Sequence, residues 1–140
     1  MVSMSRSLAF ALGCALLPAL SAQGQEIGQT EYLDSCAQCH GVSGSGDGPL
    51  AGYLTTSLPD LTTIQRDNGG VFPVTALYRI IDGSDTSGTH GTSEMPAWGS
   101  RFQIRGAEVA NPDFSATEAE VYARFRILAL IEFLAAIQQD

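Results

Sequence analysis

The chain has 140 residues, a formal net charge of −8 and no lysine. Its seven arginines are outnumbered by fifteen acidic residues, which argues against nucleic acid as a partner because binding to phosphates needs a basic surface. Its three cysteines are too few for a small domain held together by several disulfides.

Residues 1–22 have the composition of a secretory signal peptide. Arg6 is the only charge, and an apolar run from Leu8 to Leu20 follows it. Pro18 interrupts this run, which is also too short for a membrane-spanning helix. The segment therefore predicts export to the periplasm.

We expect cleavage after Ala22, or alternatively after Gly24, where small residues end the segment. Retention as an anchor and lipid attachment at Cys14 are weaker alternatives, since the residues before Cys14 fit a lipoprotein signal poorly. The exported part, residues 23–140, is long enough for one domain with one core. Six arginines and fifteen acids give it a net charge of −9, and no membrane span is expected in it.

The exported part predicts an all-α fold of three to five helices with long loops. A short helix from Glu26 to Ser35 leads to Cys36, and the glycine-rich segment 41–52 follows as a loop. A helical turn or two begins near Pro59 and stops at the glycines of residues 68–70. Residues 72–83 form the next helix, since their apolar residues recur at helical spacing up to a terminal glycine.

The segment from Ser84 to Asn111 is expected to be irregular because it is rich in Gly, Ser and Thr. A final helix runs from about Ala116 to about Gln138, opened by a capping box of Ser115 and Glu118. Two apolar stripes on this helix predict burial against more than one neighbour: Val121, Phe125, Leu128 and Ile131, and Ile127, Leu130, Leu134 and Ile137. The core is small for so many glycines, so another group is expected to fill the centre.

The sequence CAQCH, residues 36–40, is the attachment motif for c-type haem, and we favour this interpretation. Two thiols one helical turn apart can each bond a vinyl group, and the next histidine can ligate the iron. A disulfide would close almost no loop. A thioredoxin-like dithiol needs a βαβ context, and a zinc site needs a fourth ligand, for which only His90 is left beyond Cys36, Cys39 and His40.

The iron of such a haem takes a sixth ligand or keeps an open site. Met95 is the only methionine of the exported part, and it lies in the polar loop SEMPAWG rather than on an apolar helical stripe. Small c-type cytochromes commonly pair a histidine with a methionine, so we favour Met95 over the alternative His90.

The sequence resembles the class I cytochrome c family of small exported mono-haem electron carriers. The similar segments are CAQCHG after an N-terminal helix, PDLT, FPVTALYRIIDG, HGTSEMPAWG and RILALIEFLAAIQ. The resemblance implies one haem c attached at Cys36 and Cys39, with His40 and Met95 as axial ligands. It also implies that the first and last helices cross beside the haem, where Tyr32 would contact Phe125 or Phe133.

The resemblance further implies residues around the haem. A proline carbonyl should accept the ring N–H of the proximal histidine, and we choose Pro59 over Pro49. Trp98, Arg79 and Arg101 are candidates for bonds to the propionates. The loop from His40 to Pro59 and the stretch from Gly99 to Ser115 are longer than in the shortest members of the family, and the lysine ring of some relatives is absent.

A haem with two protein ligands has no open position for a substrate. The expected function is therefore single-electron transfer in electron transport, such as a respiratory chain, either as a soluble carrier or as the haem subunit of an oxidoreductase, and not enzymatic catalysis by the chain itself. The charge of −9 predicts redox partners with a basic docking surface. The alternative is a haem domain with a labile sixth ligand that binds small ligands or catalyses a reaction.

Overall fold

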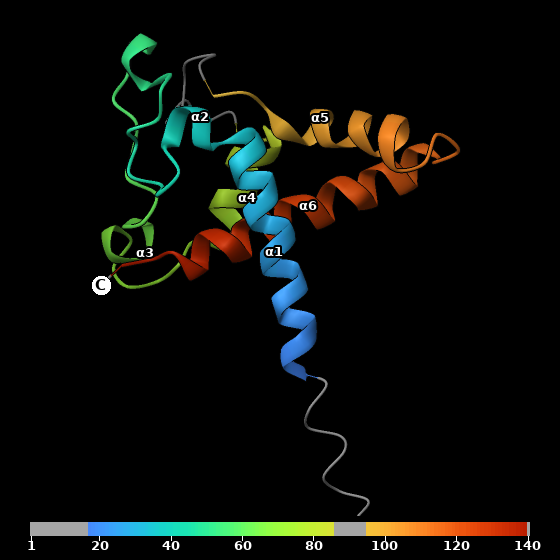
Figure 1. Cartoon of the computed structure of the whole chain (residues 1–140), viewed down its shortest axis with the longest axis horizontal. Helices are drawn as coiled ribbons and strands as arrows, with labels where there is room; N and C mark the ends of the chain where they lie inside the picture. Colours follow the sequence, from blue (N-terminus) through green and yellow to red (C-terminus); the bar gives the residue numbers. More distant parts are fainter. Residues whose placement is uncertain (1–16, 86–94, 140) are drawn as a thin grey trace, which may run out of the picture.

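The computed structural model describes residues 17–85 and 95–139. Its regular secondary structure in these ranges consists of helices, which loops connect (Figure 1). The α-helices are α1 (Leu17–Ser35), α2 (Ala37–His40), α3 (Ile64–Asp67), α4 (Val74–Asp82), α5 (Trp98–Arg105) and α6 (Ala116–Ala136). A short 3₁₀ helix, η1 (Ala51–Tyr53), and a π-helical turn, η2 (Gly106–Ala110), complete the described elements. No strand occurs in the described ranges, so the predicted all-α fold is confirmed.

Helices α1 and α6 cross, and α5 lies along the N-terminal half of α6 (Figure 1). At the crossing, the rings of Tyr32 and Phe133 have their centroids 5.1 Å apart. The predicted contact between the first and last helices is therefore confirmed with Phe133 as the partner. Phe125, the other candidate, is 51% exposed and lies on the outer face of α6.

Helix α1 is longer than the sequence predicts. It ends at Ser35 as expected, but it begins at Leu17 rather than near Glu26. The two cleavage positions considered above, after Ala22 and after Gly24, both fall inside this helix. The cleavage of the leader stays a prediction, and Cys14 lies outside the described residues.

The prediction of an irregular segment from Ser84 to Asn111 is wrong for residues 98–110, which form α5 and η2. The glycines in this stretch permit close packing instead of ending the helix. A Cβ on Gly99 would come within 2.7 Å of the Asp82 carbonyl, and one on Gly106 within 2.8 Å of the Tyr122 ring. Phe102, between them, is 1% exposed and anchors α5 in the core.

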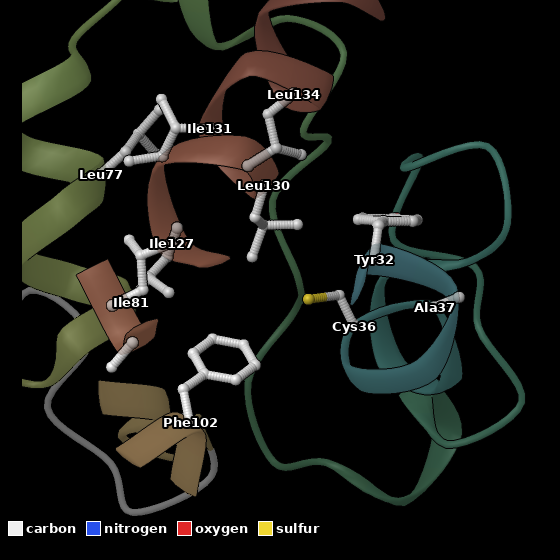
Figure 2. Close-up of a cluster of buried hydrophobic side chains, with 11 residues drawn as sticks. Tyr32, Cys36, Ala37, Leu77, Ile81, Phe102, Ile127, Leu130, Ile131 and Leu134 are labelled. Carbon is white, nitrogen blue, oxygen red and sulfur yellow. The ribbon is translucent and has the colours of Figure 1, made fainter. Parts of the chain in front are cut away.

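Helix α4 begins at Val74 and ends at Asp82, close to the prediction. Gly83 follows with a φ of 86°, the left-handed conformation that commonly ends helices. Leu77 and Ile81, one turn apart, are its buried residues and meet α6 in the core (Figure 2).

Helix α6 begins with the predicted capping box. The Ser115 hydroxyl accepts a hydrogen bond from the Glu118 amide at 3.3 Å, and the Glu118 carboxylate accepts one from the Ser115 amide at 2.9 Å. The Ser115 hydroxyl also donates to the Glu118 carboxylate at 2.6 Å, and this bond, together with the one from the Ser115 amide, lowers the pKa of the exposed Glu118 carboxyl because both favour its charged form.

The expectation that both apolar stripes of α6 are buried is wrong for one of them. Ile127, Leu130 and Leu134 are buried, as is Ile131 (Figure 2). Val121, Phe125 and Leu128, however, are 62%, 51% and 51% exposed. Of this stripe, Ile131 is therefore the one residue that the core covers, and the other three side chains are largely open to solvent.

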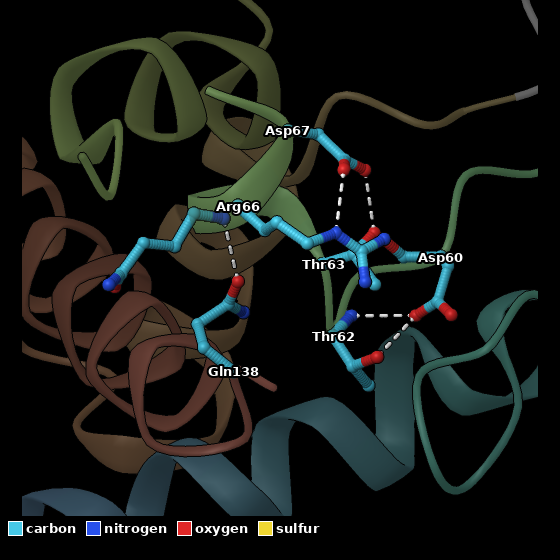
Figure 3. Close-up of polar contacts among 7 residues, drawn as sticks. Asp60, Thr62, Thr63, Arg66, Asp67 and Gln138 are labelled. Atoms are coloured by element: carbon cyan, nitrogen blue, oxygen red, sulfur yellow. Dashed lines mark hydrogen bonds and ion pairs between the residues drawn. The ribbon is translucent and has the colours of Figure 1, made fainter. Parts of the chain in front are cut away.

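The end of the chain is fastened to the segment around α3 (Figure 3). The Gln138 side chain accepts a hydrogen bond from the Gln65 amide at 2.8 Å and donates one to the Leu61 carbonyl at 2.8 Å. The Thr62 hydroxyl donates to the Asp60 carboxylate at 2.6 Å, which lowers the pKa of Asp60. These bonds fix the segment that follows the loop around CAQCH.

None of the described helices is both long and apolar enough to cross a membrane.

Candidate haem site

The CAQCH segment forms a single tight turn at the end of α1. The Cys36 amide donates to the Tyr32 carbonyl at 2.8 Å, so Cys36 continues the hydrogen bonding of α1. Its own carbonyl accepts from the amides of Cys39 and His40 at 3.1 and 2.9 Å. The turn thus brings Cys36, Cys39 and His40 together within one short piece of backbone, as the motif requires.

The three functional groups of this turn differ in exposure. Cys36 and His40 are buried, at 9% and 7% exposure, whereas Cys39 is half-buried. Both cysteines are free thiols, so the structure gives no support to a disulfide between them. No group of three or more His, Cys, Asp or Glu side chains suited to a metal ion occurs within the described ranges.

The surroundings of Cys36 are apolar. Its sulfur projects from the turn toward Phe102 and Leu130 of the core (Figure 2). Burial, together with the nearby charges of Glu31 and Cys39, raises the pKa of the Cys36 thiol to about 12. A redox-active dithiol needs a lowered thiol pKa, so this environment does not suit a thioredoxin-like function. It does suit a thiol that faces a large apolar group.

The glycine-rich loop after His40 wraps back around the turn. The amides of Gly46, Gly48 and Leu50 donate to the carbonyls of His40, Cys39 and Gln38 at 2.8, 3.1 and 2.9 Å, respectively. A Cβ on Gly48 would lie 2.5 Å from the carbonyl oxygens of both Cys39 and Gln38, so only glycine allows this approach. The loop therefore satisfies the last carbonyls of α2 and holds the turn in place.

The two candidate prolines lie differently with respect to this turn. Pro49 is held against it by the backbone bonds of its neighbours, Gly48 and Leu50. The carbonyl of Pro59 would be 3.5 Å from a Cβ on Gly46, in the loop that follows the turn. The choice of Pro59 as the acceptor for the histidine ring stays a prediction.

Met95 is half-buried and lies three residues before α5 begins at Trp98. His90, the alternative ligand, lies outside the described residues. The structure thus places Met95 at the start of the chain segment whose helix supplies Phe102 to the space in front of Cys36 (Figure 2).

Trp98 and Arg101, two of the three candidates for propionate contacts, lie together. The Arg101 guanidinium is 5.0 Å from the centroid of the Trp98 ring, which is 6.1 Å from that of Phe102. Arg79, the third candidate, is exposed on α4. The structure records no ion pair of Arg79 or Arg101 with a described residue.

The residues present fit a covalently attached haem. The Trp98 indole Nε1 is buried and finds no hydrogen-bond acceptor among the described residues. A buried N–H of this kind needs an acceptor, which a haem propionate would supply. The unlinked thiols of Cys36 and Cys39, the adjacent buried His40 and the apolar wall of Phe102 and Leu130 supply the other features that the group requires.

The fold and this turn define a small helical protein built around a haem-attachment motif. The family model for cytochrome c matches residues 25–119, from within α1 to the first turn of α6. The chain belongs to the cytochrome c family, whose members carry covalently bound haem c and transfer electrons. Comparisons with curated proteins and with solved structures gave no match.

One charged cluster near the site is not predicted by the sequence reasoning above. Glu31 of α1 is 2% exposed and is paired with Arg105 and Arg126, which lie 74 and 95 residues further along the chain. No local pattern links residues so far apart. The one local hint in the sequence is an acidic residue, Glu31, next to Tyr32 on the side of α1 that is buried, since a buried acid needs a charged partner.

Proposed function

We propose that this protein is an exported mono-haem cytochrome c that passes single electrons between redox partners, as a soluble carrier or as the haem subunit of an oxidoreductase. The observation that carries the proposal is the single CAQCH turn, with a buried His40 whose carbonyl accepts a hydrogen bond from the Gly46 amide of the loop that wraps around it. When bound, the haem supplies an iron that alternates between the ferrous and ferric states. The protein would hold it through Cys36 and Cys39, with His40 and Met95 on the iron.

Several residues would position the group without bonding the iron. Pro49 or Pro59 would accept the ring N–H of His40 through a backbone carbonyl, which fixes the orientation of the imidazole. The buried Trp98 N–H would donate to a propionate, with Arg101 beside it as a cation. Phe102 and Leu130 would exclude water from the side that Cys36 faces.

The ligand assignment predicts the response of the visible spectrum to carbon monoxide. We expect the reduced wild-type protein not to bind carbon monoxide at neutral pH, because Met95 completes the iron coordination. The Met95→Ala variant should bind it and should have a lower reduction potential, since a thioether raises the potential of haem iron. Absorption spectra of the purified holoprotein, with and without carbon monoxide, measure both states.

The matched control is His90→Ala, which should leave the spectrum unchanged. If His90→Ala alters the spectrum and Met95→Ala does not, the sixth ligand is His90. If the wild-type protein itself binds carbon monoxide readily, the sixth site is labile and the function is ligand binding or catalysis rather than simple electron transfer.

The acidic charge of the chain supports a partner with a basic docking surface. Asp34 and Asp47 are exposed and lie near the CAQCH turn, where they would add negative charge beside the attachment site. Such surface charges attract a cation and are screened within about 10 Å at 0.1 M salt. The exported, periplasmic location that we propose rests on the signal-like composition of residues 1–22.

The steering can be measured without knowing the natural partner. The rate constant of oxidation by a small cationic metal complex should fall several-fold as the salt concentration rises from about 0.01 to 0.2 M. The rate constant with an anionic complex of similar potential should rise over the same range. Stopped-flow measurements with both complexes check this. If neither rate constant depends on the salt concentration, the proposal of a partner with a basic docking surface is contradicted.

A further inference from the structure

A buried charged cluster joins three helices close to the CAQCH turn. The Glu31 carboxylate of α1 accepts one hydrogen bond from Arg105 Nη1 of α5 at 2.9 Å and one from Arg126 Nη1 of α6 at 2.7 Å. Each carboxylate oxygen therefore has an arginine of its own. The cluster carries one negative and two positive charges, and its carboxylate is 2% exposed.

Both arginines also contact aromatic rings. The Arg126 guanidinium lies 4.9 Å from the centroid of the Tyr122 ring, and that of Arg105 lies 5.8 Å from the centroid of Phe102. The side chains of Arg126 and Arg105 are 25% and 38% exposed. A carboxylate can be buried only when it is paired in this way, so the charges stay fixed within the protein.

The charge of Glu31 acts on Cys36, one of the two predicted attachment residues of the haem. Glu31 precedes Cys36 by five residues on α1, and its charge is the second cause, after burial, of the raised pKa of the Cys36 thiol. Phe102, which carries Arg105 over its ring, also faces the Cys36 sulfur across the core (Figure 2). A charge that acts on this sulfur also acts on a group bonded to it.

We propose that the Glu31–Arg105–Arg126 cluster sets the reduction potential of the haem, with the Glu31 carboxylate stabilising the ferric state and the two arginines stabilising the ferrous state. The proposal rests on attachment of the haem at Cys36. The burial of the Glu31 carboxylate makes its charge act more strongly than a surface charge of the same sign. These residues are positioning residues for the electrostatics of the site and do not touch the iron.

The sign of the effect differs between the charges, which provides the test. Glu31→Gln removes a negative charge and should raise the potential, changing the ferrous-to-ferric ratio by roughly threefold or more. For a one-electron couple, a threefold change corresponds to about 28 mV, since a tenfold change corresponds to 59 mV. Arg105→Gln removes a positive charge and should lower the potential by a similar factor. The double variant restores the net charge of the cluster and should return toward the wild-type potential.

The measurement is an equilibrium redox titration of the holoprotein followed by visible absorption, with circular dichroism to verify the fold. Glu26→Gln is the matched control, because Glu26 lies on the same helix but is exposed. Its effect should be small and should disappear at high salt, whereas the effects of the cluster variants should persist. If Glu31→Gln does not fold, Arg105→Lys replaces it as the comparison, because it keeps the positive charge and should keep a potential near the wild-type value. Arg105→Gln, which leaves Glu31 paired with Arg126, should still lower the potential.

A purely structural role would loosen the site in both single variants and shift their potentials in the same direction. That result, or no shift in either variant, would overturn the proposal. Failure of the proposed function is distinguishable, because the denatured protein would then retain no haem whatever the variants do.

Discussion

We expect replacement of both Cys36 and Cys39 by alanine to abolish the covalent retention of haem. The wild-type protein, denatured in acid and organic solvent, is expected to keep its haem bound to the chain, and the double variant to keep none. Each single variant should keep one thioether and therefore retain haem to a reduced extent. Haem staining of a denaturing gel, with mass spectrometry of the intact chain, measures these outcomes directly.

The double variant should also be less stably folded. Phe102 and Leu130 lie in the core on the side that Cys36 faces. Without the haem this side would lose the apolar contacts that the group would make. We therefore expect a loss of helical circular dichroism in addition to the loss of colour. Covalent attachment would let a small domain keep a group that completes its core.

The control lies within the same turn. Gln38 is exposed between the two cysteines and contributes its backbone carbonyl to the loop, so Gln38→Ala should leave haem retention unchanged. Haem that extracts fully from the wild-type protein would show that the two thiols are not its attachment points.

The features that the sequence predicted correctly are those that depend on residues close together in the chain. The CAQCH spacing, the capping box at Ser115 and Glu118, and the helix that ends at Gly83 each depend on residues within a few positions of one another. The crossing of the first and last helices came from the family resemblance. The contact of Tyr32 with Phe133 shows that this inference is correct.

The parts that the sequence did not predict depend on packing between distant segments. Gly99 and Gly106 indicate a loop by composition, yet both lie where a helix approaches its neighbour too closely for a side chain. Phe125 belongs to an apolar stripe, but α6 has no neighbour on that side among the described elements. Glu31 finds its arginines only after three helices have come together.

The crossing of α1 and α6 depends on one glycine. A Cβ on Gly28 would lie 2.0 Å from the Ala129 carbonyl oxygen, 2.7 Å from its carbon and 2.9 Å from the Phe133 Cβ. These atoms belong to the backbone of α6 or are attached directly to it, so they cannot move away without moving the helix. Any side chain at position 28 must push the two helices apart.

We therefore expect Gly28→Ala to destabilise the protein by about 3 kcal/mol, the upper part of the usual range for overpacking. The change would otherwise be favourable, since alanine in a helix is better than glycine by about 1 kcal/mol. Separation of the helices would also loosen the contact of Tyr32 with Phe133 and the placement of Cys36, which follows Tyr32 by one turn. Guanidinium unfolding of the holoprotein, followed by circular dichroism, measures the loss.

Gly52→Ala is the matched control, because nothing lies within 4 Å of a Cβ at that position. It should change the free energy of unfolding by less than about 0.5 kcal/mol, as substitutions at open surface positions generally do. A Gly28→Ala variant as stable as the Gly52→Ala variant would mean that the helices do not approach as closely as described. A shift of α1 relative to α6 would also displace the site, because α1 carries Tyr32 and Glu31 on its buried side and leads into the CAQCH turn. One glycine therefore links the stability of the helix pair to the position of the thiol that we propose bears the haem.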